Sequence, residues 1–322
     1  MREFAFELAV CAALEAESDG IVARQLGTHS RIVDVVEIDP GPAFEARTEI
    51  TAEAIPGPAI ESDVGVGSPR RPTAAIDTAP NRAEAVADRA VEIGFFEAER
   101  RGGRRYVRQA ARYPDWISGL RAIENKPDLG RPGDLERQLR KDVSLSLFDE
   151  VVLVTASYVT GAHLNRIPEA VGVRRFDAET GTFETIREPS RLSTDETGIA
   201  IVDEHSARVD IEPIEAETKA RFRRRLAERA YGKGWRPEAL PGCEHAAARG
   251  PPFSPAEELP YCAWKGRFVD QPRECGPDCA GYSPAEPPSS DPVTRRDQRT
   301  PWKADPDGVT RRQVGLDRFS DG

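Results

Sequence analysis

The sequence predicts an α/β protein, in which a mixed β-sheet is flanked by helices. Three observations predict it. Apolar side chains recur at helical spacing in residues 3–18. Residues 31–38 are β-branched and apolar, the composition of a buried strand. Residues 120–126, 133–147 and 151–155 have the patterns of a strand, a helix and an apolar strand, joined by short loops. That order is typical of a right-handed βαβ crossover between parallel strands.

The remaining elements follow from the same patterns. Residues 21–24 fit either a short edge strand or a further turn of helix, and a weaker strand is expected at 172–176. Residues 215–233 predict a strongly basic amphipathic helix, whose arginines either contact phosphates or are solvated and paired with neighbouring glutamates. The last 40 residues are rich in Pro, Asp and Arg and are expected to be extended or disordered.

Length and hydropathy limit the class of protein. A chain of 322 residues is long enough for about two domains. No stretch approaches the ~18 apolar residues that span a membrane. The first three residues lead directly into an amphipathic pattern with acidic residues, which does not resemble a signal peptide. We therefore expect a cytoplasmic protein with no membrane partner.

The charge balance is acidic, with 55 Asp and Glu against 45 Lys and Arg, and only six of the basic residues are lysines. This composition is similar to that of haloarchaeal proteins. A net charge of −10 ordinarily argues against nucleic-acid partners. In molar salt, however, the Debye length falls to about 3 Å, so net charge says little about a local binding groove.

Residues 45–110 have the character of an insert. Helical stretches near 47–55 and 80–93 flank a Pro/Gly-rich piece, and two strand-like runs then meet at Gly102-Gly103, which predicts a hairpin. The helix and hairpin together resemble the recognition helix and wing of a winged helix-turn-helix domain. Four arginines near the turn would then contact DNA phosphates: Arg100, Arg101, Arg104 and Arg105. A solvated, charged hairpin explains the pattern equally well, and winged helices also serve as protein-docking modules.

The clearest chemical signal is Glu124-Asn125-Lys126 at the end of a predicted strand. Alternate residues of a strand share a face, so Glu124 and Lys126 are expected to point the same way. A carboxylate, the Asn125 carbonyl oxygen and one more acid suit Mg²⁺, and the lysine can serve an attacking water. The E-x-K pattern alone is common on solvated strand edges.

The order of several motifs resembles the PD-(D/E)XK nuclease superfamily, particularly its Holliday-junction-resolvase-like and RecB-like branches. Glu7 on the first helix, Asp34 on an apolar strand, the E-x-K strand, Gln138 on the next helix and the apolar strand 151–155 appear in the order of that family. The resemblance covers residues 3–38 and 118–177. The whole chain also resembles an uncharacterised haloarchaeal family, which adds no functional expectation.

The resemblance implies a restriction-endonuclease-like fold and Mg²⁺- or Mn²⁺-dependent hydrolysis of DNA. Asp34, Glu124 and the Asn125 carbonyl would hold the metal. Lys126 would serve the water, and Glu7 with Gln138 would orient the surrounding groups.

One feature departs from the family, because Asp34 and Glu124 are ninety residues apart. An inserted domain explains that spacing. The rival acid is Asp115, nine residues before Glu124, which a tight turn at Ser118-Gly119 would bring to the same face. We prefer Asp34, because its flanking strand is better formed.

Four cysteines are concentrated late in the chain, with the spacing C-x18-C-x12-C-x3-C: Cys243, Cys262, Cys275 and Cys279. In a cytoplasmic protein such a group indicates a metal site sooner than disulfides. Four thiolates favour a structural Zn²⁺, with His245 as an alternative ligand. The RecB-like resemblance makes an iron–sulfur cluster the second candidate. Reduced, unliganded cysteines are the third.

These patterns divide the chain into a first core segment (1–44), the insert (45–112), a second core segment (113–212), the basic helix with the four-cysteine segment (213–282) and a tail (283–322). The expected function is a metal-dependent endonuclease acting on DNA in repair, recombination or defence. A catalytically inactive DNA-binding regulator is the alternative, and a protein-interaction scaffold is a third class. RNA as a substrate and a homodimer stay open.

Overall fold

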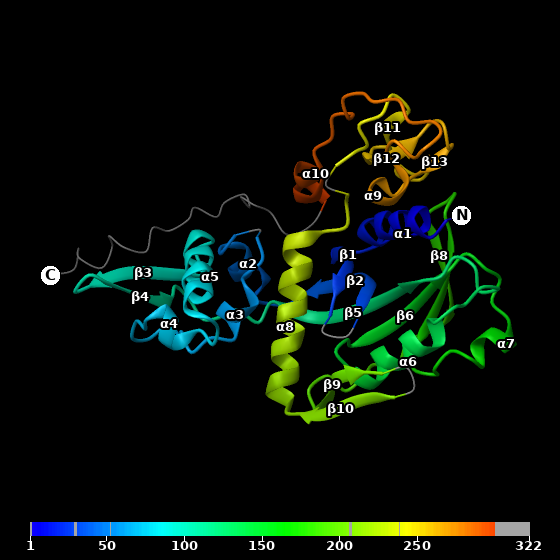
Figure 1. Ribbon diagram of the computed structural model, residues 1–322. Coiled ribbons are helices and arrows are strands. Elements are labelled where there is room, and N and C mark those ends of the chain that lie inside the picture. The colour runs from blue at the N-terminus through cyan, green and yellow to red at the C-terminus, as the bar shows by residue number, and fades with distance from the viewer. Residues whose placement is uncertain (1, 29–30, 52, 206–207, 238, 300–322) are drawn as a thin grey trace. The chain divides into compact units, whose positions relative to one another are not determined.

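The computed structural model describes residues 2–299 except 29–30, 52, 206–207 and 238. Its contacts divide these residues into two compact units, one formed by 2–41 and 117–299 and the other by 42–116 (Figure 1). The second unit interrupts the first between two strands. Its bounds lie within four residues of the insert expected at 45–112.

The first unit is a six-stranded mixed sheet flanked by helices, so the predicted α/β class is confirmed. The strands adjoin one another in the order β1 (Ile21–Gly27), β2 (Ile32–Pro40), β5 (Ile117–Asn125), β6 (Glu150–Thr155), β7 (Gly172–Asp177) and β8 (Thr182–Arg187). β5, β6 and β7 run parallel, whereas the other neighbouring pairs are antiparallel. Residues 21–24 therefore belong to an edge strand, and β8 was not predicted.

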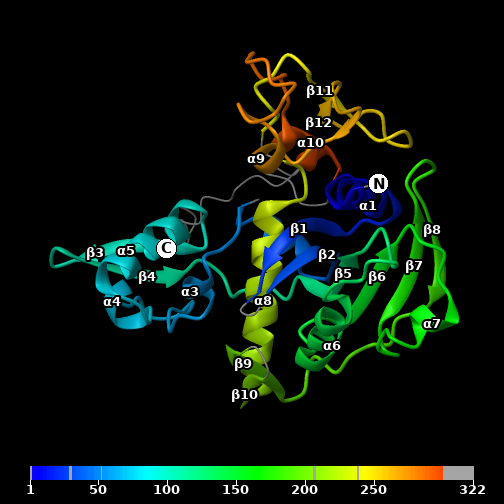
Figure 2. The same ribbon diagram turned by 45° about the vertical axis from the view of Figure 1, so that its right-hand side comes forward.

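Helix α1 (Glu3–Glu17) covers one face of the sheet. Its apolar side chains form a buried cluster with residues of three adjoining strands, including Val35, Ile123 and Val152. Because alternate residues of a strand point to opposite faces, Glu124 points away from α1. Helix α6 (Leu135–Leu145) lies on that other face and connects β5 to β6 (Figure 2).

The pairing of β2 with β5 explains how acids far apart in sequence come together. These strands are antiparallel, and Val35 lies opposite Ile123. The start of β2 therefore lies beside the end of β5. Continuing the register by one residue places Asp34 opposite Glu124. The insert does not disturb this pairing. It connects the end of β2 to the start of β5, whereas Asp34 and Glu124 lie at the other end of this strand pair.

The insert forms a helical unit with a hairpin. Its helices are α2 (Phe44–Thr48), α3 (Gly57–Ile60), α4 (Pro72–Ala75) and α5 (Pro80–Glu92), and its hairpin pairs β3 (Phe96–Arg101) with β4 (Arg104–Gln109). Gly102 and Gly103 both have positive φ, as a two-residue hairpin turn with right-handed strand twist requires. Arg70 also exchanges two backbone hydrogen bonds with Val107 of β4, each 2.8 Å long. The Pro/Gly-rich piece thus contains two short helices and a bridge to the hairpin.

Helix α8 (Ala216–Lys233) packs beside β1 and β5. The alternative of a solvated helix paired with neighbouring glutamates is wrong for two of its side chains. Arg223 lies 2.7 Å from Asp149, and buried Lys219 donates to the Ser193 carbonyl. The residues before α8 form an antiparallel pair that was not predicted, β9 (Gly198–Glu204) with β10 (Val209–Ile214), and α7 (Gly161–Leu164) precedes β7.

The cysteine segment contains a small sheet of β11 (Ala246–Arg249), β12 (Leu259–Cys262) and β13 (Arg267–Phe268), followed by helix α9 (Gln271–Glu274). Helix α10 (Pro292–Arg299) lies in the region expected to be extended or disordered, so that expectation is wrong there. The rest of the tail, 300–322, lies outside the described residues. None of the helices described is long and apolar enough to cross a membrane.

Candidate functional site

Two carboxylates meet where β2 begins and β5 ends. Glu124 is buried, with 5% of its surface exposed, and Asp34 is half-buried beside it. The Asp34 carboxylate accepts a hydrogen bond of 2.9 Å from the backbone N–H of Asn125. This hydrogen bond links Asp34 of β2 to the last residue of β5. The structure therefore brings together the two acids that the sequence proposed, in spite of the ninety residues between them.

Burial and crowding perturb both acids. Removal from water and the neighbouring Asp34 carboxylate, acting against the lowering effect of Arg31, together raise the pKa of Glu124 to about 7. The pKa of Asp34 is raised by burial, whereas the Asn125 N–H and Arg31 lower it. Raised pKa values of neighbouring acids are typical of sites that bind a cation or move a proton.

Glu7 lies on α1, near enough to Asp34 for the two charges to interact. It is 7% exposed and accepts hydrogen bonds from Arg24 at 2.8 Å and from Gln25 at 2.7 Å. Burial raises the pKa of Glu7, and the Asp34 charge raises it further, against the effect of Arg24. Gln25 has a φ of 54°, a left-handed conformation that is uncommon for a residue other than glycine. Both partners of Glu7, on β1, were missed in the sequence.

Lys126 lies one residue beyond the end of β5. Its ammonium group donates to Glu3 on α1 at 2.6 Å, and it lowers the pKa of Asp34 through its charge. Its side chain is 22% exposed. Lys126 thus lies beside Asp34 and is partly exposed to solvent.

The structure adds a basic residue and a fourth acid that the sequence did not single out. The Arg31 guanidinium donates to Glu124 at 3.0 Å and to both carboxylate oxygens of Asp142 on α6. Asp142 is 3% exposed, and burial raises its pKa against the effect of Arg31. Glu136 on the same helix, by contrast, pairs with Arg140 at the surface.

The other proposed site residues lie elsewhere. Gln138 is half-buried one turn before Asp142, and no hydrogen bond to its side chain is found in the described part of the chain. Asp115 is exposed in the second unit, where its backbone carbonyl accepts from Ala43. Ser118 and Gly119 lie within β5 and form no tight turn, so the expected route of Asp115 to Glu124 is wrong.

Asn125 presents an unusual feature beside the acids. Its side chain is buried, yet neither its amide nitrogen nor its amide oxygen has a hydrogen-bond partner among the described residues. Leaving such groups unpaired costs about 1–3 kcal/mol each. Its backbone N–H positions Asp34, and the role of its carbonyl as a metal ligand stays a prediction.

In the insert, the four arginines differ in their contacts. Arg105 is ion-paired with Asp88 of α5, and Arg101 pairs with Glu99 and lies over the Tyr106 ring. Arg100 and Arg104 are exposed, and neither forms an ion pair with any residue described.

The four late cysteines are reduced and line one pocket. Cys243 and Cys262 are buried, and Cys275 and Cys279 are half-buried. His245 does not line this pocket and instead stacks on Trp264, with 5.8 Å between ring centroids. As the side chains stand, no three or more His, Cys, Asp or Glu residues within the described ranges are arranged as a metal site.

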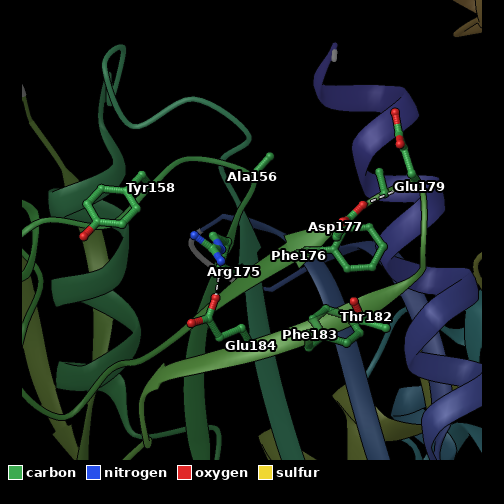
Figure 3. A pocket seen from close by; sticks show the side chains of 10 residues that line it. Ala156, Tyr158, Arg175, Phe176, Asp177, Glu179, Thr182, Phe183 and Glu184 are labelled. Carbon is green, nitrogen blue, oxygen red and sulfur yellow. Dashed lines mark hydrogen bonds and ion pairs between the residues drawn. The ribbon is translucent and has the colours of Figure 1, made fainter.

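An open pocket of about 640 Å³ lies where β6 and β7 end (Figure 3). Phe176 and Phe183 form its floor, and Tyr158 is exposed at its side. Its one arginine, Arg175, is already paired with Glu184 at 2.5 Å. Two more carboxylates line it, so its charge does not favour a phosphate group.

The fold and site define a mixed α/β protein with a group of buried acids at the shared end of two antiparallel strands. Residues 21–284 match the model of a family of unknown function (DUF5787). Because the match covers well over half of the chain, the protein belongs to this family. The matched range includes the insert and the four cysteines as well as the sheet. No curated protein and no solved structure matches the chain at a significant level.

Proposed function

We propose that the protein is a metal-dependent nuclease that hydrolyses phosphodiester bonds of DNA. One observation carries the proposal: the Asp34 and Glu124 carboxylates are brought together at the junction of β2 and β5, with Lys126 two residues after Glu124. Acids that share a site repel one another, and a bound divalent cation relieves that repulsion.

The order of the elements supports this proposal. Glu7 lies on α1, Asp34 on β2, Glu124 on β5, and the chain continues through α6 into the apolar strand β6. That is the order implied by the resemblance to PD-(D/E)XK nucleases. The insert between β2 and β5 accounts for the long spacing between the two acids.

The donor set fits a hard divalent cation, because Mg²⁺ and Mn²⁺ prefer oxygen ligands. Asp34 and Glu124 would hold it, together with the Asn125 carbonyl. When bound, the cation supplies an activated water and neutralises charge on the phosphate. Arg31 must release Glu124 for this to occur, and it can do so while remaining paired with Asp142.

The other side chains have roles that follow from their contacts. Lys126 can orient the attacking water or stabilise the negative charge that develops on the phosphate. Glu7, held by Arg24 and Gln25, keeps a negative charge close to Asp34. These groups lie at the edge of the sheet where β5 ends, and Lys126 is partly open to solvent there.

The insert supports DNA as the substrate. Helices α4 and α5 are joined by four residues, 76–79, as in a helix-turn-helix, and the hairpin follows as a wing would. Arg100 and Arg104 are exposed at the hairpin turn, and Arg82 is exposed in the first turn of α5. Arginines at such positions contact phosphates or base edges in winged-helix proteins.

The Arg31 ion pairs favour the second candidate function, a DNA-binding regulator without catalysis. A guanidinium between Glu124 and Asp142 compensates two buried carboxylates without any metal. In such a protein the core would serve as a scaffold, and the insert would carry the function.

The two functions are separated by a cleavage assay. Labelled duplex, branched and single-stranded DNA are incubated in high KCl with Mg²⁺, Mn²⁺ or EDTA. We expect metal-dependent cleavage by the wild type and a loss of about 10²-fold or more in Lys126→Ala. Arg140→Ala, at an exposed position of α6, is the control and should cleave as the wild type does.

Two results would argue against the nuclease. Folded wild-type protein that binds DNA but cuts none of the substrates would favour the regulator. Cleavage that is equally fast in Lys126→Ala, or that persists in EDTA, would place the activity outside this group of acids.

A further inference from the structure

The four late cysteines converge although they come from different parts of the segment. Cys243 precedes β11, Cys262 ends β12, and Cys275 and Cys279 flank a turn after α9. All four line one small pocket. Ala246 lies opposite Cys262 in the small sheet, and the Ala246 N–H donates to the Cys243 carbonyl. The pairing of β11 with β12 thereby brings the first two cysteines together.

From this convergence we infer that Cys243, Cys262, Cys275 and Cys279 bind a single Zn²⁺ through four thiolates. Zn²⁺ accepts four sulfur ligands in tetrahedral geometry and needs no open coordination position in a structural site. The bound ion would draw the four sulfur atoms inward from where they line the pocket.

The pocket has room for a single ion. The space open to the centre of a water molecule among its lining residues is about 10 Å³, which is room for about one water molecule. The metal analysis described below separates a single ion from an iron–sulfur cluster.

The charges around the pocket suit thiolates. Lys265 lines it, and Arg267 lies close enough to Cys262 and Cys275 for their charges to interact. Four thiolates around Zn²⁺ leave a net charge of −2, which these two cations would offset in part, because the Glu274 carboxylate also lines the pocket. Lys265 donates to the Glu274 carbonyl at 3.0 Å, and Arg267 donates to the Glu274 carboxylate at 3.0 Å. Both cations therefore bind Glu274, and this fixes the position of the next residue, Cys275.

The segment also needs such a cross-link to be stable. Its strands have four, four and two residues, and few of its apolar side chains are buried. Small sheets of this kind depend on a metal or on disulfides, because their own core is insufficient. The same segment contacts the region of α1, since Glu274 accepts from Arg2 before α1 at 3.1 Å and Leu259 belongs to the α1 cluster.

The test is the metal content of protein purified under reducing conditions, measured by elemental analysis and by native mass spectrometry. We expect one Zn²⁺ per chain, and substoichiometric zinc in Cys262→Ser and Cys279→Ser. Cobalt substitution should give the visible spectrum of a tetrahedral thiolate site. Cys11→Ala is the matched control, because Cys11 is buried in α1 and should not affect metal content.

Three outcomes would overturn the inference. Iron with acid-labile sulfide would show a cluster. Two disulfides in the purified protein would show a covalent cross-link. Folded, metal-free protein whose four cysteines alkylate freely would show that the thiols have no ligand. If the cysteine variants do not fold, the metal content and cobalt spectrum of the wild type still show whether the four thiolates bind one Zn²⁺. None of these results depends on nuclease activity.

Discussion

Arg31 compensates the negative charges of two buried acids of the candidate site, Glu124 and Asp142. Its guanidinium is 9% exposed and lies between the carboxylates of Glu124 and Asp142. Removing one partner of a buried ion pair leaves an uncompensated charge, which is strongly destabilising. Exposed pairs are worth far less, because water screens them.

We therefore expect Arg31→Ala to lower the free energy of unfolding by about 3–5 kcal/mol in EDTA. Arg140→Ala, which removes an exposed pair with Glu136, should lower it by about 0.5 kcal/mol or less. Denaturant unfolding measures both. Mn²⁺ should restore part of the free energy of unfolding that Arg31→Ala loses, because a bound cation can compensate the negative charge of Glu124. Equal and small effects of the two variants would mean that Arg31 does not compensate buried charge.

The sequence singled out two acids that the structure brings together, Asp34 and Glu124, and missed the residues around them. The acid of E-x-K and the Asp in an apolar strand could be singled out, because a carboxylate among apolar strand residues demands a partner. Asp142 looked like one charge among many on a polar helix. Its burial arises from Arg31, 111 residues away in the chain, and no local pattern reports such a contact. Gln138 was favoured only because the family resemblance places a Gln on that helix.

Among the elements, the β3–β4 hairpin makes the sharpest prediction for DNA binding. Arg100 and Arg104 are exposed at its turn, whereas Arg105 is held by Asp88. We expect Arg100→Ala with Arg104→Ala to weaken binding to all DNA sequences alike. The slope of log affinity against log salt should fall by about 2, one for each phosphate contact.

Fluorescence anisotropy over a series of KCl concentrations measures this slope. Arg108→Ala is the control, because Arg108 is paired with Glu97 at 2.6 Å on the body of the hairpin. An unchanged slope in the double variant would mean that the turn does not contact DNA, and a protein-docking role would then be favoured.

At the same scale, the elements that the sequence missed have weak or ambiguous patterns. β8 has few apolar residues and pairs only at the edge of the sheet. β9 and β10 pair with each other outside the main sheet, and three of their apolar side chains, Val202, Val209 and Ile211, are exposed. The alternation of apolar and polar residues that predicts a half-buried strand is therefore weak in β9 and β10. Strands with long apolar runs, β2 and β6, were predicted within two residues of their bounds.

Across the whole molecule, the chain accommodates an insert without changing the sheet that contains the acids. The two segments of the core pair as β2 and β5, and the insert has a hydrophobic core of its own. The sequence predicted this division from the shift to Pro/Gly-rich composition and from the long gap between the acids. It could not predict the burial of α1 on nearly all sides, because this depends on the C-terminal segment. There Arg236, paired with Glu257 at 2.9 Å, also pairs with Glu15 of α1 at 2.5 Å.

The central claim is that Asp34 and Glu124 form a cation site, and Mn²⁺ binding tests it most directly. Glu124 must be ionised to bind the cation, and its pKa is raised to about 7. Affinity should therefore increase as the pH rises toward about 7 and level off above it. Glu124→Gln should bind Mn²⁺ at least about 10-fold more weakly, without this pH dependence.

Isothermal titration calorimetry across this pH range measures the affinity, and Glu136→Gln, at the surface of α6, is the control. Mn²⁺ is a hard cation that prefers oxygen ligands, so the cysteine segment should not contribute. Tight, pH-dependent binding that is lost in Glu124→Gln and kept in Glu136→Gln is the result we predict. Absent binding, or binding equal in all three proteins, would contradict the account.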